Sequence, residues 1–380
     1  MTKSDSVYMD HAAATPVDPA VRVAMQPYLA DEFYNPSATY AAASRANKAL
    51  QAARVEIAHW LGARPAEVIF TAGGTEANNL AIHGVMRRFT EGNVVVSAVE
   101  HESVLQPARR HDVREAAVKA DGRIDLADLA RKIDDRTVLV SIIYANNEIG
   151  TVQPIREISR LIAEKRATRK STTPLLLHTD ACQATNYLDL HVSRLGVDLM
   201  TLNSGKIYGP KQSGGLYVKA GIELMPLIDG GGQERGLRSG TENVAAAVGF
   251  AEALKLAQAD RREETTRLQT LQRLFIDELQ RQLPDVVVNG SSKYRLPNNV
   301  HVTLPGRDNE RLLIQLDEAG ILAAAGSACS ADKGEPSHVL KALGVSDADA
   351  RASLRFTMGR ETDEAMVRRT VQTLAQLLLP

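Results

Sequence analysis

Short runs of β-branched and other apolar residues alternate with longer segments of helical periodicity along the first 250 residues. Five runs have the length and composition of buried strands: residues 94–97, 137–143, 175–178, 199–202 and 215–218. Helical patterns lie between them, as at residues 41–61 and 155–168. Strands that alternate with helices in this way predict a mostly parallel sheet covered by helices on both faces.

Polar residues follow these predicted strands where each strand ends. They are Glu100 with His101, Asn146 to Glu148, Asp180 with Gln183, and Lys206. In open parallel sheets, ligands bind beyond the carboxyl ends of the strands. The sequence therefore predicts a functional site at this edge of the sheet.

The pattern changes near residue 250. Residues 252–283 are dense in charge and contain neither Gly nor Pro, and their apolar positions, such as Leu268, Leu271 and Phe275, share one helical face until Pro284. We expect one long amphipathic helix here, then strands at 286–288 and 300–304 and a helix at 310–319. This predicts a large domain at 20–250 and a smaller α+β domain built from 1–19 and 251–380.

Composition narrows the function classes. The 380 residues include 45 basic and 46 acidic side chains, which disfavours nucleic-acid binding driven by overall charge. Two cysteines are too few for a disulfide framework or a four-cysteine zinc site, and the histidines show no metal-ligand spacing. The first residues lack the apolar core of a signal peptide, and no apolar run could span a membrane. We expect a cytoplasmic enzyme without a metal, a membrane contact or a direct nucleic-acid contact.

Lys206 is the first candidate for chemistry. It directly follows an apolar strand and is surrounded by two glycines and a proline. A lysine that is desolvated at a strand end can form a Schiff base, although most lysines are solvated surface charges. Asp180 ends the preceding strand, and such a carboxylate would suit pyridoxal phosphate because it keeps the pyridine nitrogen protonated. The alternative is that Asp180 only caps a helix.

A phosphate group would need a cradle of backbone amides. Gly73, Gly74 and Thr75 lie between an apolar run and a helical pattern, where glycine conformations and a helix N-terminus can bind an anion. A turn of this kind also occurs without a ligand. It is not the Gly-Lys-Ser/Thr loop of nucleotide-binding proteins, since Ile207 follows Lys206.

Three more residues are candidates, each with a structural alternative. His101 could stack on a flat cofactor or move protons. Cys329 lies in a run of small residues at about 323–336, and a thiol in such a segment could visit a site and leave with a product. Otherwise it is a buried apolar cysteine, which is our expectation for Cys182. Arg355, on a strand-like alternation, could hold a carboxylate or lie at the surface.

Taken together, these motifs resemble the pyridoxal-phosphate cysteine desulfurases of the NifS/IscS type, in the class V aminotransferase group of fold-type I. The resemblance extends over almost the whole chain. It rests on short motifs in a fixed order: Asn35-Pro-Ser, Thr71-Ala-Gly-Gly-Thr-Glu, Glu100-His, Asn146-Asn-Glu-Ile-Gly, Asp180-Ala-Cys-Gln, Lys206-Ile-Tyr-Gly-Pro-Lys, Gly326-Ser-Ala-Cys and Arg355-Phe-Thr-Met-Gly-Arg. The resemblance implies an α/β fold with a mostly parallel seven-stranded sheet and a smaller α+β domain, and a homodimer.

The resemblance also implies roles for individual residues. Lys206 would hold pyridoxal 5'-phosphate covalently and move protons, while Asp180 would pair with the pyridine nitrogen. His101 would stack on the ring and assist proton transfer, and Gln183 would bond the phenolic oxygen. The residues implied to contact the phosphate are Gly74, Thr75, Asn203, Ser204 and the partner subunit's Thr241.

The implied substrate is L-cysteine, with its carboxylate held by Asn147 and Arg355 and the Asn35 segment nearby. The Cys329 thiolate would take the sulfur as a persulfide and release L-alanine. A sulfur-acceptor protein would then receive it, for iron–sulfur cluster assembly, tRNA thiolation or DNA phosphorothioation. The alternatives are a selenocysteine lyase, another class V lyase or aminotransferase, and a catalytically silent assembly scaffold. A nicotinamide dehydrogenase is excluded, because no Gly-x-Gly-x-x-Gly follows the first strand.

Two features depart from the family pattern. Gly205 stands where many members have a histidine that reaches the phosphate, so that Asn203, Ser204 or a glycine amide would have to substitute for it. The sequence also ends at Leu377-Leu-Leu-Pro, without the longer extension with which housekeeping desulfurases dock their scaffold. We therefore expect the identity of the acceptor to be open.

Overall fold

The computed structural model describes residues 6–326 and 336–378, and its central feature is a seven-stranded sheet. Neighbouring strands follow the order β2 (Val68–Thr71), β8 (Gly214–Val218), β7 (Leu199–Asn203), β6 (Leu176–Asp180), β5 (Thr137–Ser141), β3 (Asn93–Ser97) and β4 (Asp112–Ala116). Only β8 runs antiparallel to its neighbours. The predicted mostly parallel seven-stranded sheet is confirmed.

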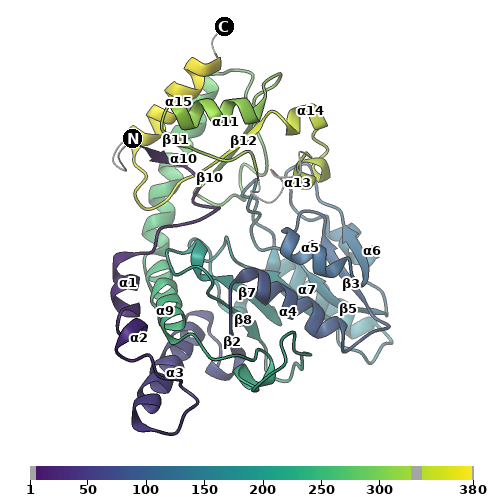
Figure 1. Cartoon of the computed structure of the whole chain (residues 1–380). Helices are drawn as coiled ribbons and strands as arrows, with labels where there is room; N and C mark the ends of the chain where they lie inside the picture. Colours follow the sequence, from purple (N-terminus) through teal and green to yellow (C-terminus); the bar gives the residue numbers. More distant parts are fainter. Residues whose placement is uncertain (1–5, 327–335, 379–380) are drawn as a thin grey trace.

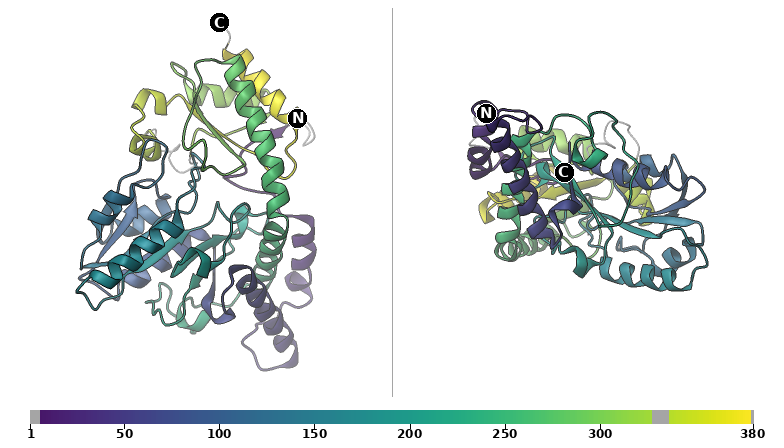
Figure 2. Two further views of the ribbon diagram at one scale, coloured as in Figure 1. Left: turned by 180° about the vertical axis from the view of Figure 1, so that it is seen from behind. Right: turned by 90° about the horizontal axis from the view of Figure 1, so that it is seen from below.

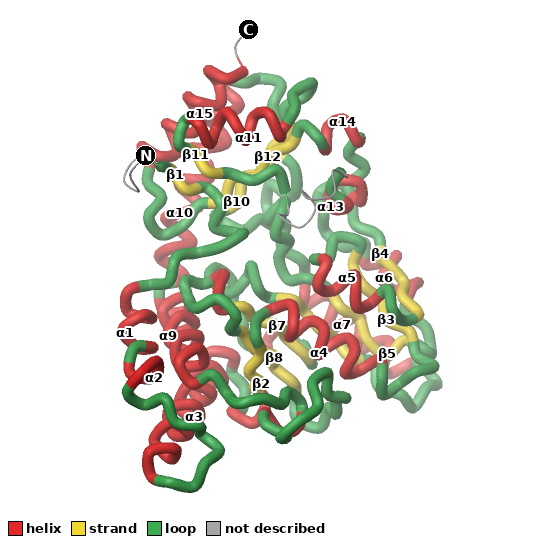
Figure 3. Tube along the Cα trace, viewed as in Figure 1, coloured by secondary structure: helices red, strands yellow, loops and turns green. Residues whose placement is uncertain are grey.

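Helices cover both faces of this sheet (Figures 1 and 3). The apolar sides of α4 (Gly74–Met86) and α5 (Glu102–Ala108) form one core cluster with the sheet. The cluster on the other face includes side chains of α3 (Ala41–Leu61), α7 (Ile155–Thr168) and α9 (Val244–Ala259). Central strands such as β5 and β6 are buried along their whole length, which explains their continuous apolar runs.

Smaller sheets lie above the large one and use both ends of the chain. β10 (Asn299–Thr303) pairs antiparallel with β9 (Val287–Val288) and β12 (Ser353–Thr357). β1 (Val7–Tyr8) pairs parallel with β11 (Ile321–Leu322), so that the first strand joins this part of the molecule. Its helices are α10 (Arg261–Gln282), α11 (Asn309–Glu318), α13 (His338–Ala342), α14 (Asp347–Ala350) and α15 (Glu364–Leu378).

The single helix predicted over 252–283 is wrong in its boundaries. The structure has two successive helices, because α9 ends at Ala259 and α10 begins at Arg261 (Figure 2). α9 is rich in alanine and buries most of its surface, whereas α10 buries one stripe that includes Leu268 and Phe275. The junction at Asp260 lets each helix present the face that its own surroundings require.

The remaining helical segments are short: α1 (Pro19–Met25), α2 (Pro27–Ala30), α6 (Leu126–Lys132), α8 (Val192–Leu195) and the 3-10 turns η1 (Pro65–Glu67), η2 (Ser204–Lys206) and η3 (Glu234–Gly236). Among the described residues, no helix combines the length and the apolar character that a bilayer crossing requires. The strands β5, β6 and β7 end at the same edge of the sheet, and this edge positions the site.

Candidate active site

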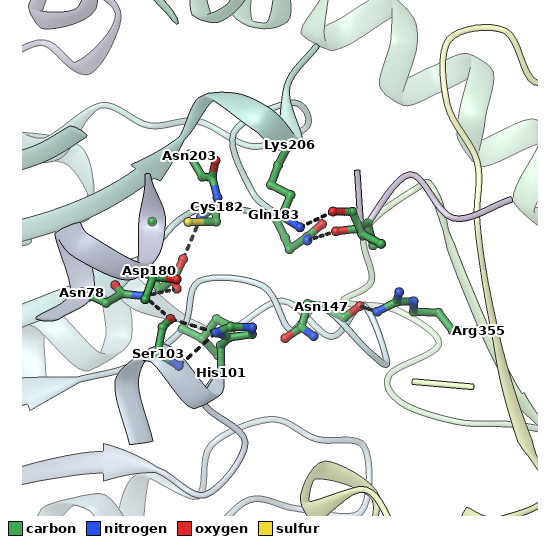
Figure 4. Close-up of a pocket in the computed structure, with 15 residues that line it drawn as sticks. Asn78, His101, Ser103, Asn147, Asp180, Cys182, Gln183, Asn203, Lys206 and Arg355 are labelled. Carbon is green, nitrogen blue, oxygen red and sulfur yellow. Dashed lines mark hydrogen bonds between the residues drawn. The ribbon is translucent and has the colours of Figure 1, made fainter. Parts of the chain in front are cut away.

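A cleft of about 670 Å³, including its open mouth, lies at the carboxyl ends of the parallel strands (Figure 4). Its walls come from these strand ends, from the N-terminus of α4, from Ala12 and Ala13, and from β12. Nine of the residues singled out in the sequence line it: Gly74, Thr75, His101, Asn147, Asp180, Gln183, Asn203, Lys206 and Arg355. The fold thus gathers residues that are up to 281 positions apart.

Lys206 enters the cleft from the turn η2, which directly follows β7. Asn203 caps that turn, because its Oδ1 accepts a hydrogen bond from Gly205 N over 3.0 Å. The Lys206 amine donates to the carbonyl oxygen of Ala13 over 2.5 Å, and Asn186 holds the Lys206 carbonyl. The contact to Ala13 therefore places the amine inside the cleft.

Asp180 ends β6 and is almost fully buried. Its Oδ2 accepts from Asn78 Nδ2 over 2.7 Å, and its Oδ1 accepts from Cys182 N over 2.9 Å. The Cys182 side chain also faces Asp180 (Figure 4), and burial together with this carboxylate raises the pKa of the Cys182 thiol well above its usual range. Cys182 is only partly buried, rather than buried as expected, and it lines the cleft as a neutral thiol.

His101 is the N-cap of α5 and faces the cleft. Its Nδ1 accepts a hydrogen bond from Ser103 N over 3.1 Å and lies 2.8 Å from Ser103 Oγ. Burial lowers the pKa of His101, against the opposing effect of Asp180, and Lys206 lowers it further. The imidazole is therefore held in its neutral form near pH 7.

The N-terminus of α4 forms the end of the cleft that could bind an anion. Gly73, with φ at 130°, adopts a backbone conformation that favours glycine, and Gly74 begins a helix of 13 residues. A Cβ on Gly74 would lie 2.7 Å from Cys182 Sγ, so that only glycine fits without displacement. Free backbone N–H groups and the helix dipole favour a phosphate here.

The opposite end of the cleft carries a buried arginine. Arg355 on β12 donates from Nη2 to Asp10 Oδ1 over 2.7 Å and from Nη1 to the carbonyl oxygen of Asn147 over 3.0 Å. Its Nε has no hydrogen-bond partner among the described residues. Gln183, closer to Lys206, donates to the carbonyl oxygen of Ala12 over 2.9 Å.

Three predicted residues of the described part of the chain do not line this cleft, and a fourth cannot be placed. Ser204 is buried with its Oγ directed at Gly209, where a Cβ would lie 2.1 Å away. Thr241 lines a separate cavity beside Glu234. Asn35 is exposed, and its Oδ1 accepts from the backbone of a neighbouring residue in its own loop. Cys329 lies outside the described residues.

Sequence reasoning missed three residues of the site. Asn78 follows Gly74 by one helical turn, and this spacing could have placed it on the same face. Ser103 follows His101 by two residues, in the first turn of a helix, where a side chain can bond its N-cap. Asp10 is 345 positions from Arg355, and nothing in a single sequence connects the two.

These residues fit pyridoxal phosphate. An amine, a buried carboxylate and a helix N-terminus with one tightly packed glycine, Gly74, line one cleft, and these are the groups that an aldehyde, a pyridine nitrogen and a phosphate require. A buried amide oxygen, Asn78 Oδ1, has no partner within the described chain. The fold and the chemistry of this cleft define the class of fold-type I pyridoxal-phosphate transferases.

Comparison with known proteins assigns the chain within that class. The profile described as "Aminotransferase class-V" matches residues 7–369. A "Cysteine desulfurase IscS" of Dictyoglomus turgidum is 39% identical over 98% of this chain and 94% of its own. A solved "NIFS-LIKE PROTEIN" superimposes with a TM-score of 0.90 at 29% identity, covering 98% of this chain and 99% of its own.

A second solved structure, "SspA in complex with cysteine", has a TM-score of 0.80 and 35% identity, covering 93% of this chain and 99% of its own. The chain belongs to the class-V aminotransferase family, among the cysteine desulfurases of the NifS/IscS type. The resemblance predicted from the short motifs is confirmed.

Proposed function

We propose that this chain is a pyridoxal-phosphate-dependent L-cysteine desulfurase that produces L-alanine and carries the sulfur on Cys329. The observation that carries the proposal is that the Lys206 amine, the Asp180 carboxylate and His101 line one cleft at the strand ends. The full-length similarity to proteins named cysteine desulfurase supports it, as does the related SspA, which was solved in complex with cysteine.

The cofactor would be held by groups at both ends of the cleft. Lys206 would bind the aldehyde carbon covalently, Asp180 would pair with the ring nitrogen, and Gln183 would bond the phenolic oxygen. The N-terminus of α4, at Gly74 and Thr75, would hold the phosphate. When bound, pyridoxal phosphate withdraws electrons from the substrate carbons and so makes the carbon–sulfur bond cleavable.

The remaining steps belong to the chain's own residues. Arg355, with Asn147 beside it, orients the substrate carboxylate, and the Lys206 amine moves protons within the cleft once substrate has replaced it. The carbon–sulfur bond of L-cysteine breaks, a sulfur–sulfur bond forms at Cys329, and a proton takes the place of the sulfur on carbon. The carbon is reduced as the sulfur is oxidised, so that no other oxidant or reductant is required.

We include a homodimer in the proposal. Thr241 lies outside the cleft of its own chain, which suits a residue that reaches the cleft of a second copy. Large apolar side chains such as Val23, Leu29 and Phe33 are 64%, 65% and 67% exposed in the single chain, and a partner could bury them. The two-domain division at residues 19/20 and 250/251 likewise stays a proposal.

The acceptor of the sulfur is proposed as a protein. Iron–sulfur cluster assembly, tRNA thiolation and DNA phosphorothioation are the pathways in which it could act. The name IscS among the relatives favours the first of these. A pull-down with a Cys329→Ser variant, followed by identification of co-purifying proteins, distinguishes among the three.

Two experiments test the proposed reaction. Borohydride reduction of the holoprotein followed by peptide mapping should locate the cofactor on Lys206, and its location elsewhere contradicts the proposal. Cys329→Ala should keep the cofactor absorbance yet form no alanine from L-cysteine, with Cys182→Ala as the matched thiol control. Alanine formation by Cys329→Ala would favour the alternative of a lyase, such as a selenocysteine lyase, that needs no thiol. Protein that stays colourless with added cofactor would favour a scaffold.

A further inference from the structure

A series of hydrogen bonds connects the Asp180 carboxylate with the His101 imidazole, and both side chains line the cleft. Asn78 Nδ2 donates one hydrogen to Asp180 Oδ2 over 2.7 Å and the other to Ser103 Oγ over 2.8 Å (Figure 4). Ser103 Oγ lies 2.8 Å from His101 Nδ1, and Ser103 N donates to the same nitrogen over 3.1 Å. Asn78 is fully buried and Ser103 nearly so, so that water does not compete for these bonds.

Within this series of hydrogen bonds, the chemistry of the groups determines which atom donates and which accepts. A backbone N–H can only donate, so His101 Nδ1 must be the acceptor of the bond from Ser103 N. Asn78 fills one acceptor position of the Ser103 hydroxyl, which leaves that hydroxyl free to donate to His101 Nδ1. The opposite orientation of the Asn78 amide would place its oxygen against the Asp180 carboxylate, which is unfavourable. The neutral imidazole must therefore carry its proton on Nε2.

We propose that Asn78 and Ser103 are positioning residues that hold the Asp180 carboxylate and the Nε2–H tautomer of His101 in one rigid unit. Every proton that His101 exchanges with a bound molecule then passes through Nε2, because Nδ1 is occupied by two donors. The inference rests on the proposed function only for the identity of that molecule. It gives Asn78 and Ser103 a role that neither had in the sequence analysis.

The charges around His101 are compatible with this arrangement. Asp180 from β6, Glu102 from α5 and Glu148 from the loop after β5 favour the protonated imidazole, whereas Lys206 from η2 opposes it. Burial outweighs the carboxylates, and the pKa of His101 is lowered. Removing the Ser103 hydroxyl takes away a donor that occupies Nδ1, so that protonation at Nδ1 becomes easier.

The test begins with the tautomer, read in the protein without cofactor. Two-bond proton–nitrogen correlation spectra of ¹⁵N-histidine-labelled protein, with His101→Gln to assign the signal, should show the proton on Nε2. Ser103→Ala should move the titration midpoint of His101 to higher pH, and Ser103→Thr should restore it. In the double variant Asn78→Ala/Ser103→Ala, His101 should titrate at the same midpoint as in Ser103→Ala. The reason is that Asn78 acts on His101 through the Ser103 hydroxyl.

Cofactor affinity provides the second readout. Asn78→Ala should raise the dissociation constant for pyridoxal phosphate about tenfold or more, as expected for the loss of a hydrogen bond to a charged group. Asn309→Ala, which removes an amide hydrogen bond from α11 to the carbonyl oxygen of Ser353, is the control and should leave this constant within twofold. Thermal unfolding of each variant shows that it is folded.

Two results would overturn the inference. One is a proton on Nδ1 of His101 in the wild-type protein. The other is that Ser103→Ala and Asn78→Ala leave both the midpoint and the cofactor affinity unchanged. The tautomer is read without cofactor, so that protein unable to bind pyridoxal phosphate would contradict the proposed function and leave this test intact.

Discussion

Ser337 donates a hydrogen bond from Oγ to Glu148 Oε2 over 2.6 Å, and this bond fastens the start of α13 to the loop that carries Asn147. Glu148 is almost completely buried. A Cβ on Gly326 would lie 3.2 Å from the same carboxylate oxygen. Glu148 thus bonds Ser337 and lies close to Gly326, which stand on the two sides of the segment that contains Cys329.

We therefore predict that Ser337→Ala destabilises the protein. The change removes a hydrogen-bond donor from a buried carboxylate, and such a bond contributes about 1.5–3 kcal/mol. The free energy of unfolding from urea denaturation should fall by that amount, and Ser337→Thr should recover most of it. Ser346→Ala, which removes the exposed N-cap serine of α14, is the control. It should lower the free energy of unfolding by a smaller amount, because it affects only that short helix. A Ser337→Ala protein as stable as the wild type would show that the bond contributes nothing.

The packing of Gly74 against Cys182 gives a second prediction. Gly74→Ala would bring the new Cβ to 2.7 Å from Cys182 Sγ, and overpacking of this kind costs about 1–3 kcal/mol. The free energy of unfolding should fall accordingly, and the affinity for pyridoxal phosphate should fall with it because α4 shifts. The double variant Gly74→Ala/Cys182→Ala should recover both, since the sulfur is gone. Equal losses in the single and double variants would contradict the steric explanation.

Much of the fold could be predicted from the sequence, because buried parallel strands are continuous apolar runs. β5 and β6 are of this kind. β4 was not predicted, because it lies at the edge of the sheet and its residues, from Asp112 to Ala116, are mostly polar and partly exposed. The junction at Asp260 was also missed, since neither Gly nor Pro marks it.

The site could be predicted where its residues follow strand ends or a glycine turn, as Asp180, Lys206 and Gly74 do. It could not be predicted where tertiary contacts alone create it. The pair Asp10–Arg355 joins opposite ends of the chain, and the orientation of Ser204 toward Gly209 depends on the turn η2. A motif indicates that a residue is near the ligand, but not which way its side chain points.

A buried ion pair away from the cleft gives a third prediction. Arg54 on α3 and Glu234 in η3 are bonded through two nitrogen–oxygen contacts of 2.6 and 2.8 Å, and Glu234 also accepts from Phe70 N. Glu234→Gln would leave the Arg54 charge buried without its counter-charge, which costs about 3–5 kcal/mol. The melting temperature should fall markedly. The double variant Glu234→Gln/Arg54→Met should recover part of this decrease, because the unpaired charge is then removed.

The same pair holds the segment that leads to Thr241. If the proposed dimer is formed through this segment, Glu234→Gln should also weaken self-association in analytical ultracentrifugation. Arg45→Met, on the same helix as Arg54, breaks an exposed pair with Glu32 and is the matched control; it should change stability by less than about 1 kcal/mol. A Glu234→Gln protein with wild-type stability would contradict the importance of the pair.

The last prediction concerns acid stability and depends on His178, at the centre of the large sheet. Its two ring nitrogens contact Ser141 Oγ over 2.8 Å and Thr201 Oγ1 over 3.0 Å. Complete burial lowers the pKa of His178 to about 4 in the folded protein, although Asp180 acts in the opposite direction. The unfolded chain has a histidine pKa near 6.5, so that it binds a proton at a pH where the folded protein does not.

Stability from this residue is therefore fully present above about pH 6.5 and is lost as the pH falls toward 4. Between pH 7 and pH 5, His178 alone should account for a decrease of roughly 2 kcal/mol in the free energy of unfolding, from the linkage relation. Urea denaturation at both pH values measures it, and His178→Gln, which does not titrate, should show a correspondingly smaller decrease. Comparing the difference between the two pH values, rather than the stabilities themselves, removes any general cost of the substitution. An equal decrease in both proteins would mean that His178 is protonated in the folded state, or that other histidines alone account for the acid lability.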